Sequence, residues 1–125
     1  MRTLETLRLE HNNLGTLPAE IGALSTLESL ILGWNALDEL PSQTGQLKRL
    51  LTLSLRHNQL RSLPGEIAQL ARLEHLYLED NHLSTLPREL TGLSYLHPLN
   101  LQGNPCHTNR HSSFPAQYEQ ITGQC

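Results

Sequence analysis

The chain has 125 residues, which is enough for one domain of ordinary size and too few for two. It carries 9 basic and 12 acidic residues, a formal net charge of −3, and no basic block that could follow a phosphate backbone, so we expect no nucleic acid partner. No stretch approaches the length of a membrane-spanning helix, about 18 to 20 apolar residues, and the first residues do not resemble a signal peptide. Two cysteines do not form a disulfide framework, so we expect a cytoplasmic protein without a membrane partner.

Leucine dominates the composition and recurs with a fixed period. The chain has 29 Leu and no Val, whereas an irregular core is packed from side chains of mixed shape. A constant spacing of 23 residues separates Leu4, Leu27, Leu50, Leu73 and Leu96. Four complete copies, 4–26, 27–49, 50–72 and 73–95, precede a partial copy at 96–106, and they share the pattern LxxLxLxxNxLxxLPxxIxxLxx. A repeat of this length predicts stacked coils.

Each copy predicts a short strand, a corner and a helical return. The LxL step, such as Leu7 and Leu9, has the period of two of a strand with alternate side chains inward. Later in the copy, Leu17, Ile21 and Leu24 have the spacing of a short α or 3-10 helix, and a proline opens each such segment. One copy cannot bury its own apolar face, so copies must stack and their strands must form a parallel sheet.

Two kinds of polar residue interrupt the leucine pattern. An asparagine lies three residues after the second strand leucine of every copy; these are Asn12, Asn35, Asn58, Asn81 and Asn104. We predict an internal ladder in which the inward amides satisfy backbone groups at the corners, with a ligand-binding polar row as the alternative. Thr44 occupies the slot that holds Ile21 and Ile67 in neighbouring copies, so its hydroxyl must find a backbone carbonyl.

The repeat pattern resembles the leucine-rich repeat family over residues 4 to 106. More narrowly, it is similar to the typical intracellular subtype with an LPxxIxxL second half, as in Ras-suppressor-like, Roco-type and bacterial leucine-rich repeat proteins. The resemblance implies a single α/β solenoid over residues 1–125, with a short curved parallel sheet on the concave side and short helical or 3-10 segments on the convex side. It also implies a scaffolding or signalling role.

The two ends of the chain depart from the pattern. Met1 is in register with Leu24 and no polar cap precedes it, so we expect an apolar flank and a free strand edge on the first coil. Three interpretations stay open: a piece of a longer array, a homodimer through this edge, or a short natural protein. Cys106 falls in a leucine slot, and residues 107–125 are predicted to form a C-terminal cap with Phe114, Pro115, Tyr118 and Ile121.

The sequence offers little chemistry for catalysis or metal binding. A zinc site could be imagined from Cys106, His107, His111 and Cys125, but their spacing matches no compact zinc pattern. A Cys/His nucleophile pair needs a pocket that nothing here indicates, and no glycine-rich phosphate loop occurs. We therefore predict no catalytic residue, no cofactor and no metal.

The outward side chains of the predicted sheet vary between copies, so they can determine which partner the sheet binds. Trp34 is expected to have no packing role in its slot, with Ile31 and Leu51 near it, and to act as a binding anchor; the alternative is an indole lying flat over its neighbours. Tyr77 lies two strands along, at roughly 10 Å, as a second anchor. The predicted protein-binding residues are Trp34, Ile31, Tyr77, Arg8, Glu28, Leu51, Arg56, Glu79, Asp80 and His57.

Charge on this face suggests the chemistry of the partner. Six carboxylates and two guanidinium groups give the face a net charge of −4; these are Glu5, Glu10, Glu28, Glu74, Glu79, Asp80, Arg8 and Arg56. A protein partner with basic residues around an apolar anchor would be complementary, although solvation alone can explain such charges. Histidines on or beside the face could make an interaction depend on pH; these are His11, His57, His75, His82 and His97.

Two hypotheses follow from the sequence. The first is a non-catalytic protein–protein interaction module that binds a protein partner through its concave face. The alternative is a structural assembly unit that associates with itself, or continues a longer repeat array, through its uncapped N-terminal edge.

Overall fold

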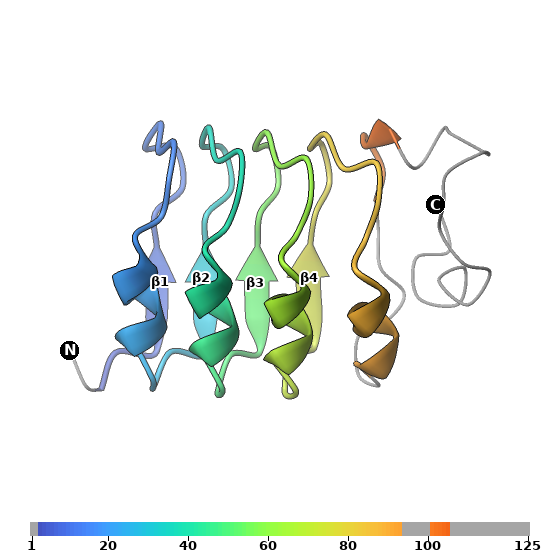
Figure 1. The fold of residues 1–125 in the computed structure, drawn as a ribbon. Helices are drawn as coiled ribbons and strands as arrows, with labels where there is room; N and C mark the ends of the chain where they lie inside the picture. Colours follow the sequence, from blue (N-terminus) through green and yellow to red (C-terminus); the bar gives the residue numbers. More distant parts are fainter. Residues whose placement is uncertain (1–2, 94–100, 106–125) are drawn as a thin grey trace.

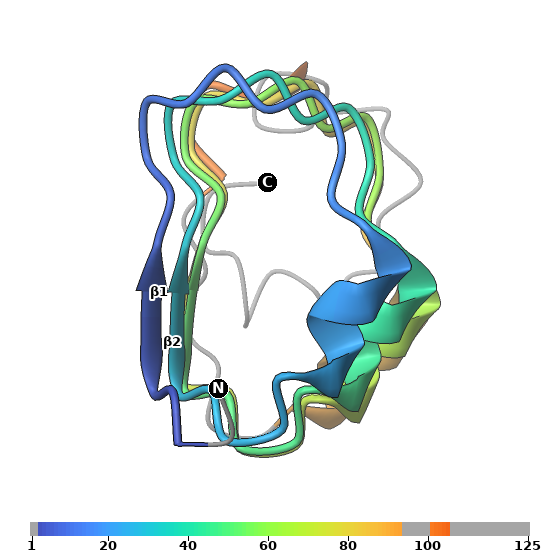
Figure 2. The same ribbon diagram turned by 90° about the vertical axis from the view of Figure 1, so that its left-hand side faces the viewer.

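Strands and 3-10 helices alternate along the chain in the computed structural model, which describes residues 3–93 and 101–105. Each strand has three residues, and each helix follows its strand on the opposite side of the coil (Figures 1 and 2). The strands are β1 (Thr6–Arg8), β2 (Ser29–Ile31), β3 (Thr52–Ser54) and β4 (His75–Tyr77). The helices are η1 (Ala19–Ala23), η2 (Ser42–Gln46), η3 (Gly65–Gln69) and η4 (Arg88–Gly92).

The strands form one parallel sheet in the order β1-β2-β3-β4 (Figure 1). Thr6 pairs with Ser29, which pairs with Thr52, so neighbouring strands are offset by one whole copy of the repeat. Seen from the end, the successive coils lie over one another with the sheet on one side and the η helices on the other (Figure 2). The predicted solenoid with a parallel sheet and short 3-10 segments is confirmed.

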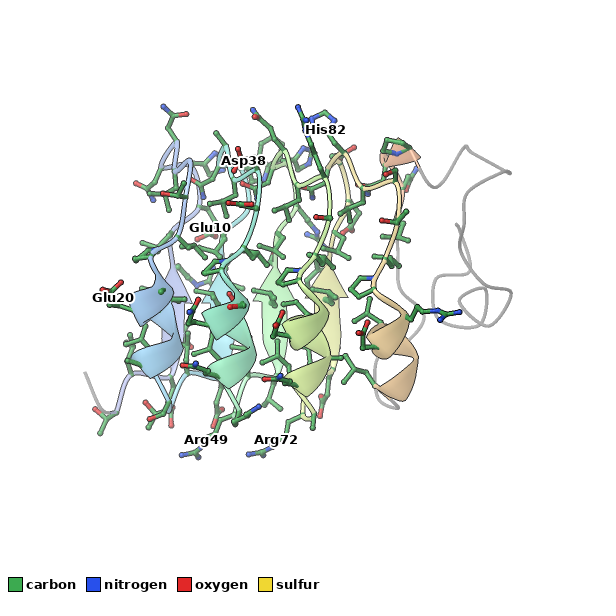
Figure 3. All side chains as sticks on the ribbon, viewed as in Figure 1. Glu10, Glu20, Asp38, Arg49, Arg72 and His82 are labelled. Atoms are coloured by element: carbon green, nitrogen blue, oxygen red, sulfur yellow. The ribbon has the colours of Figure 1, made fainter. Side chains whose placement is uncertain are left out.

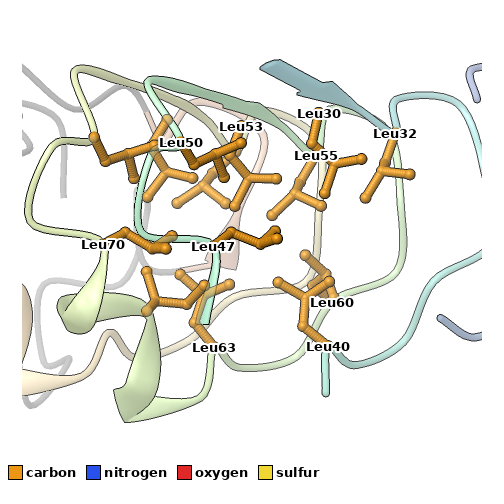
Figure 4. Close-up of a cluster of buried hydrophobic side chains, with 14 of the residues drawn as sticks. Leu30, Leu32, Leu40, Leu47, Leu50, Leu53, Leu55, Leu60, Leu63 and Leu70 are labelled. Atoms are coloured by element: carbon orange, nitrogen blue, oxygen red, sulfur yellow. The ribbon is translucent and has the colours of Figure 1, made fainter. Parts of the chain in front are cut away.

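Leucines from all sides of the coil fill the space between sheet and helices (Figure 4). In the third coil the leucine and isoleucine positions of the repeat pattern are all buried; these are Leu50, Leu53, Leu55, Leu60, Leu63, Ile67 and Leu70. One shape repeated in register packs against itself from coil to coil, which is why a core almost without other residue types suffices here.

The first coil is less buried than the coils behind it. Five of its leucines are only partly buried, whereas the equivalent leucines of the second coil are fully buried. The first-coil residues are Leu4, Leu7, Leu9, Leu14 and Leu24, and their equivalents are Leu27, Leu30, Leu32, Leu37 and Leu47. The predicted apolar flank is therefore present beside β1.

The helical returns begin after a proline, as the sequence predicts. The N-cap prolines have φ between −73° and −63°, and the carbonyl of Pro18 accepts the first helical hydrogen bond, from the N–H of Ile21 at 3.1 Å. Gly22 allows η1 and η2 to approach closely, since a Cβ there would lie 2.6 Å from the carbonyl oxygen of Gln43.

The expectation for Thr44 is wrong in one respect. Its side chain is fully buried in η2, but its Oγ1 has no hydrogen-bond partner. The stacked register places Thr44 between the slots of Ile21 and Ile67, which are apolar and buried, so the hydroxyl lies among side chains that cannot accept a hydrogen bond.

Several predictions concern residues outside the described part of the chain. They are the Met1 slot, the fifth strand with His97, Pro98 and Asn100, the Cys106 slot, the zinc set with His107, His111 and Cys125, and the C-terminal cap at 107–125.

Candidate functional site

The asparagines at the coil corners point inward and bind the backbone. Oδ1 of Asn58 accepts a hydrogen bond from the N–H of Leu37 at 3.0 Å, and its Nδ2 donates to the carbonyls of Leu32 and Leu55, both at 3.1 Å. Asn81 and Asn104 repeat this arrangement one and two coils further along. The predicted ladder is confirmed, and we call Asn12, Asn35, Asn58, Asn81 and Asn104 the Asn ladder.

The residue before each asparagine points outward and has a left-handed backbone conformation. This corner column consists of His11, Trp34, His57, Asp80 and Gly103, with φ of 60°, 60°, 57°, 59° and 81°. The N–H of Trp34 donates to the carbonyl of Arg56 at 2.8 Å, and the N–H groups of His57 and Asp80 make the equivalent bonds to the next coil. The parallel register therefore continues past the strands and places the column's side chains one above another.

The aromatic rings of the corner column stack. The indole of Trp34 lies 3.6 Å from the imidazole of His57, centroid to centroid, and 5.3 Å from that of His11, with interplanar angles of 14° and 16°. Half of the Trp34 surface stays exposed, and it is the one exposed large hydrophobic residue in the described part of the chain. The expectation that Trp34 has no packing role is thus wrong, because both faces of the indole carry a ring and its edge is what meets solvent.

Asp80 continues the column beyond the rings. Its Oδ2 lies 3.2 Å from Nε2 of His57, so the stack passes from imidazole to indole to imidazole to carboxylate. A Cβ at Gly103 would collide with the Asp80 carboxylate, which explains why the column ends in a glycine at the fifth coil. The sequence placed Trp34, His57 and Asp80 among the predicted binding residues of the face but did not reveal the stack.

One ion pair adds an arginine that changes the predicted net charge of the sheet face from −4 to −3. Arg8 lies 3.5 Å from Glu10, and Arg56 lies 3.3 Å from Glu79, each pair within one face of the sheet. Glu28 pairs at 3.7 Å with Arg49, a residue in the turn before β3 that the sequence-based charge balance left out (Figure 3). The arginine of each pair is exposed, so each pair contributes little to stability, although the Glu79 side chain is only 19% exposed.

The second predicted anchor, Tyr77, is half-buried in β4. The guanidinium carbon of Arg56 lies 4.3 Å above its ring centroid, and the ring of His75 lies 6.1 Å away in a parallel orientation. One face of Tyr77 is therefore occupied by a cation–π contact from the neighbouring strand.

Of the two apolar residues expected near Trp34, one lies elsewhere. Ile31 is half-buried and ends β2, three residues before Trp34. Leu51 is also half-buried, but its N–H bonds the carbonyl of Glu28 ahead of the strands, whereas Trp34 follows the strand end. The length of the strand separates Leu51 from Trp34, so the predicted cluster of these three residues is wrong.

A cavity of about 650 Å³ lies at the end of the corner column, lined by Arg56, His57, Glu79, Asp80, Gln102 and Gly103. Another, of about 740 Å³, lies over the loops between strands and helices, where Asp38 and His82 line it (Figure 3). The described residues contain no group of three or more side chains that could hold a metal ion. Nor does any helix in the described ranges have the length and hydropathy required to span a bilayer.

Comparison with known proteins identifies the family. The model of the leucine rich repeat matches three times in overlapping windows, at residues 2–60, 25–83 and 48–105. The chain belongs to the leucine-rich repeat family. No curated protein sequence matches it.

Solved leucine-rich repeat structures are similar over most of the chain. A leucine-rich repeat protein of Leptospira interrogans is 38% identical with a TM-score of 0.88, and the match covers 99% of this chain and 31% of that one. The BIR3–SERK2 complex from Arabidopsis thaliana contains a chain 37% identical with a TM-score of 0.70, covering 78% and 55%. The plant peptide hormone receptor RGFR1 in complex with RGF2 is 40% identical with a TM-score of 0.75, covering 83% and 17%. This leucine-rich repeat chain thus spans about a third of the length of the Leptospira protein.

Proposed function

We propose that the chain is a non-catalytic protein-binding module that engages a protein partner through the outward face of its sheet, the predicted concave side. The observation that carries this proposal is the exposed edge of Trp34, held in a fixed orientation between two imidazoles. A rigid aromatic group on a polar surface loses little conformational entropy when a partner covers it, which is typical of binding hot spots.

The distribution of constraints within the coil supports the same face. The inward positions are mostly leucine or asparagine in coil after coil, because the core and the corners require them. The outward positions follow no such rule; in the same register, Arg8, Ile31, Ser54 and Tyr77 differ in charge, size and polarity. Two of the similar structures are themselves complexes, BIR3 with SERK2 and RGFR1 with RGF2.

Capture experiments with matched variants test this proposal. A sheet-face variant combines Trp34→Ala with Tyr77→Ala, and a helix-side control combines Gln46→Ala with Gln69→Ala, two exposed side chains of η2 and η3. Proteins retained by the wild type from a lysate of the source cells are expected to be lost with the first variant and kept with the second. Equal retention by wild type and the sheet-face variant, with unchanged melting, would contradict binding at this face.

A second candidate function is self-assembly through the first coil. The observation that favours it is the apolar flank, where Leu4, Leu7 and Leu24 are only partly buried. A second copy, or a further coil of a longer array, would cover these side chains and complete their burial.

Sedimentation over a range of concentrations tests assembly without a partner. The wild type is expected to gain mass with concentration, and Leu4→Lys with Leu24→Lys is expected to stay monomeric, while Thr16→Lys, an exposed change in the same coil, leaves association intact. A wild type that stays monomeric throughout excludes the homodimer.

A further inference from the structure

The cavity at the end of the corner column lies where a side chain is missing from the column. It lies beside Asp80 and Gly103, where the run of stacked side chains stops because Gly103 has none. Its lining combines a guanidinium, an imidazole, two carboxylates and an amide, from Arg56, His57, Glu79, Asp80 and Gln102. Its volume of about 650 Å³ is ample for one long side chain of another molecule.

One lining carboxylate has an oxygen with nothing bound to it. Oε2 of Glu79 lies 3.3 Å from Nε of Arg56, but Oε1 is buried and has no hydrogen-bond partner in the structure of the described residues. The whole Glu79 side chain is only 19% exposed. Because this oxygen has no accessible surface, an occupant of the cavity cannot bond to it, and Glu79 acts on an occupant through its negative charge.

The charge of the cavity has the same sign as this unsatisfied acceptor. Elsewhere on the face, Glu10 and Glu28 are each paired with an arginine, which is always charged. In the cavity, Glu79 and Asp80 share one guanidinium, because the partner of Asp80 is the His57 imidazole, which is charged only when protonated. With that imidazole neutral, the lining carries a net charge of −1 and favours a cation over an anion.

We propose that the cavity receives a basic side chain, arginine or lysine, of the protein that the sheet face binds. The proposal rests on the proposed function and adds the chemistry of one contact to it. The cationic head faces the half-exposed carboxylate of Asp80 and is attracted by the charge of Glu79, while the alkyl stem passes the exposed edge of the Trp34–His57 stack. A guanidinium, which is planar and has several donors, can donate more than one hydrogen bond to the Asp80 carboxylate.

Small cationic probes test the cavity without the unknown partner. The probe is Nα-acetyl-L-arginine amide, with the citrulline compound as a neutral analogue of the same shape and the glutamate compound as an anion. Fluorescence reports occupancy because Trp34 is the only tryptophan of the chain and stacks on His57, which binds Asp80. Backbone amide shifts of Glu79, Asp80 and Gly103 give a second readout at the cavity itself.

The arginine probe is expected to bind saturably, and citrulline about tenfold more weakly or not at all. Glu79→Gln and Asp80→Asn are each expected to raise the dissociation constant of the arginine probe about five- to tenfold. Glu66→Gln is the control, because it removes an equal charge from an exposed residue of η3 on the helix side and should change nothing. If Glu79→Gln does not fold, Asp80→Asn carries the test.

Three results would overturn the proposal: citrulline binding as tightly as arginine, tighter binding of the glutamate probe, or equal weakening by Glu66→Gln and Glu79→Gln. The outcome is separable from that of the proposed function. If the probe binds but partner capture does not depend on Trp34 and Tyr77, the cavity proposal stands and binding through the sheet face is rejected. If partner capture depends on those two rings but the probe does not bind, the sheet face stands as the binding surface and the cavity proposal is rejected.

Discussion

At each corner of the solenoid an outward residue precedes an inward asparagine, and the two positions are built differently. Asn58 satisfies the backbone of its own coil and of the preceding one, and the same residue type recurs in each copy. His57, its neighbour, shares only a left-handed φ and an outward direction with Trp34 and Asp80. Backbone hydrogen bonding therefore requires asparagine at the inward position, whereas the residue type at the preceding outward position is free to vary.

The largest effect should come from breaking the Asn ladder. Asn58→Leu leaves the buried N–H of Leu37 without its acceptor, and it takes one of two donors from the carbonyls of Leu32 and Leu55, which keep Asn35 and Asn81. We expect a loss of about 1 to 3 kcal/mol in the free energy of unfolding, measured by urea denaturation. An unchanged denaturation midpoint would show that the hydrogen bonds of Asn58 do not stabilise the fold.

Thr44 provides the opposite case to the ladder asparagines, because its inward polar group has no hydrogen-bond partner. Thr44→Val keeps the shape of the side chain in η2 and removes the buried hydroxyl that has no hydrogen bond. We expect a gain of about 1 kcal/mol in the free energy of unfolding. Ser42→Ala, an exposed hydroxyl of the same helix, is the control, and a destabilised Thr44→Val would show that the hydroxyl is satisfied in solution.

The corner column should respond to backbone conformation more than to hydrogen bonding. With φ of 57°, His57 is in a region that glycine adopts freely and alanine does not. His57→Gly is therefore expected to be more stable than His57→Ala by about 1 kcal/mol, although both lose the ring stack. Thermal melting of the two variants measures the difference, and the reverse order would show that φ does not govern this position.

The smallest effect is expected at the first member of the ladder. Asn12 is exposed, and the one hydrogen bond given by its side chain goes to the carbonyl of Glu10 at 3.0 Å. Asn12→Ala should lower the free energy of unfolding by about 0.5 kcal/mol or less, against the larger loss at Asn58. Similar losses at both sites would mean that position in the array does not matter.

Much of the fold could be predicted because a fixed period aligns equivalent residues. Leu30 and Leu53 had to pair once the 23-residue spacing was recognised, and the corner asparagines had to meet backbone groups of adjacent coils. The partner of a single polar side chain could not be predicted in the same way. The predicted inward position of Thr44 is correct because the repeat sets it. Its predicted hydrogen bond is wrong because local geometry decides whether an acceptor is within reach.

The candidate site was predicted only in outline. Trp34 and His57 were predicted on the outward face, but their stack depends on a positive φ at both residues, which the leucine spacing does not show. The buried oxygen of Glu79 depends on how the side chains of β4 and of the coil behind it settle. Binding roles for the predicted residues and the cytoplasmic location stay predictions.

The Asn ladder also bears on how such a chain can change in length. Because every asparagine of the ladder after Asn12 joins its own coil to the one before it, a whole 23-residue unit inserted after residue 49 would find donors and acceptors ready on both sides. An insertion of another size within the pattern would leave the amide unmatched at the corner where it falls. Growth by duplication of complete units is therefore the route that this architecture leaves open, and each added unit would widen the surface available for recognition.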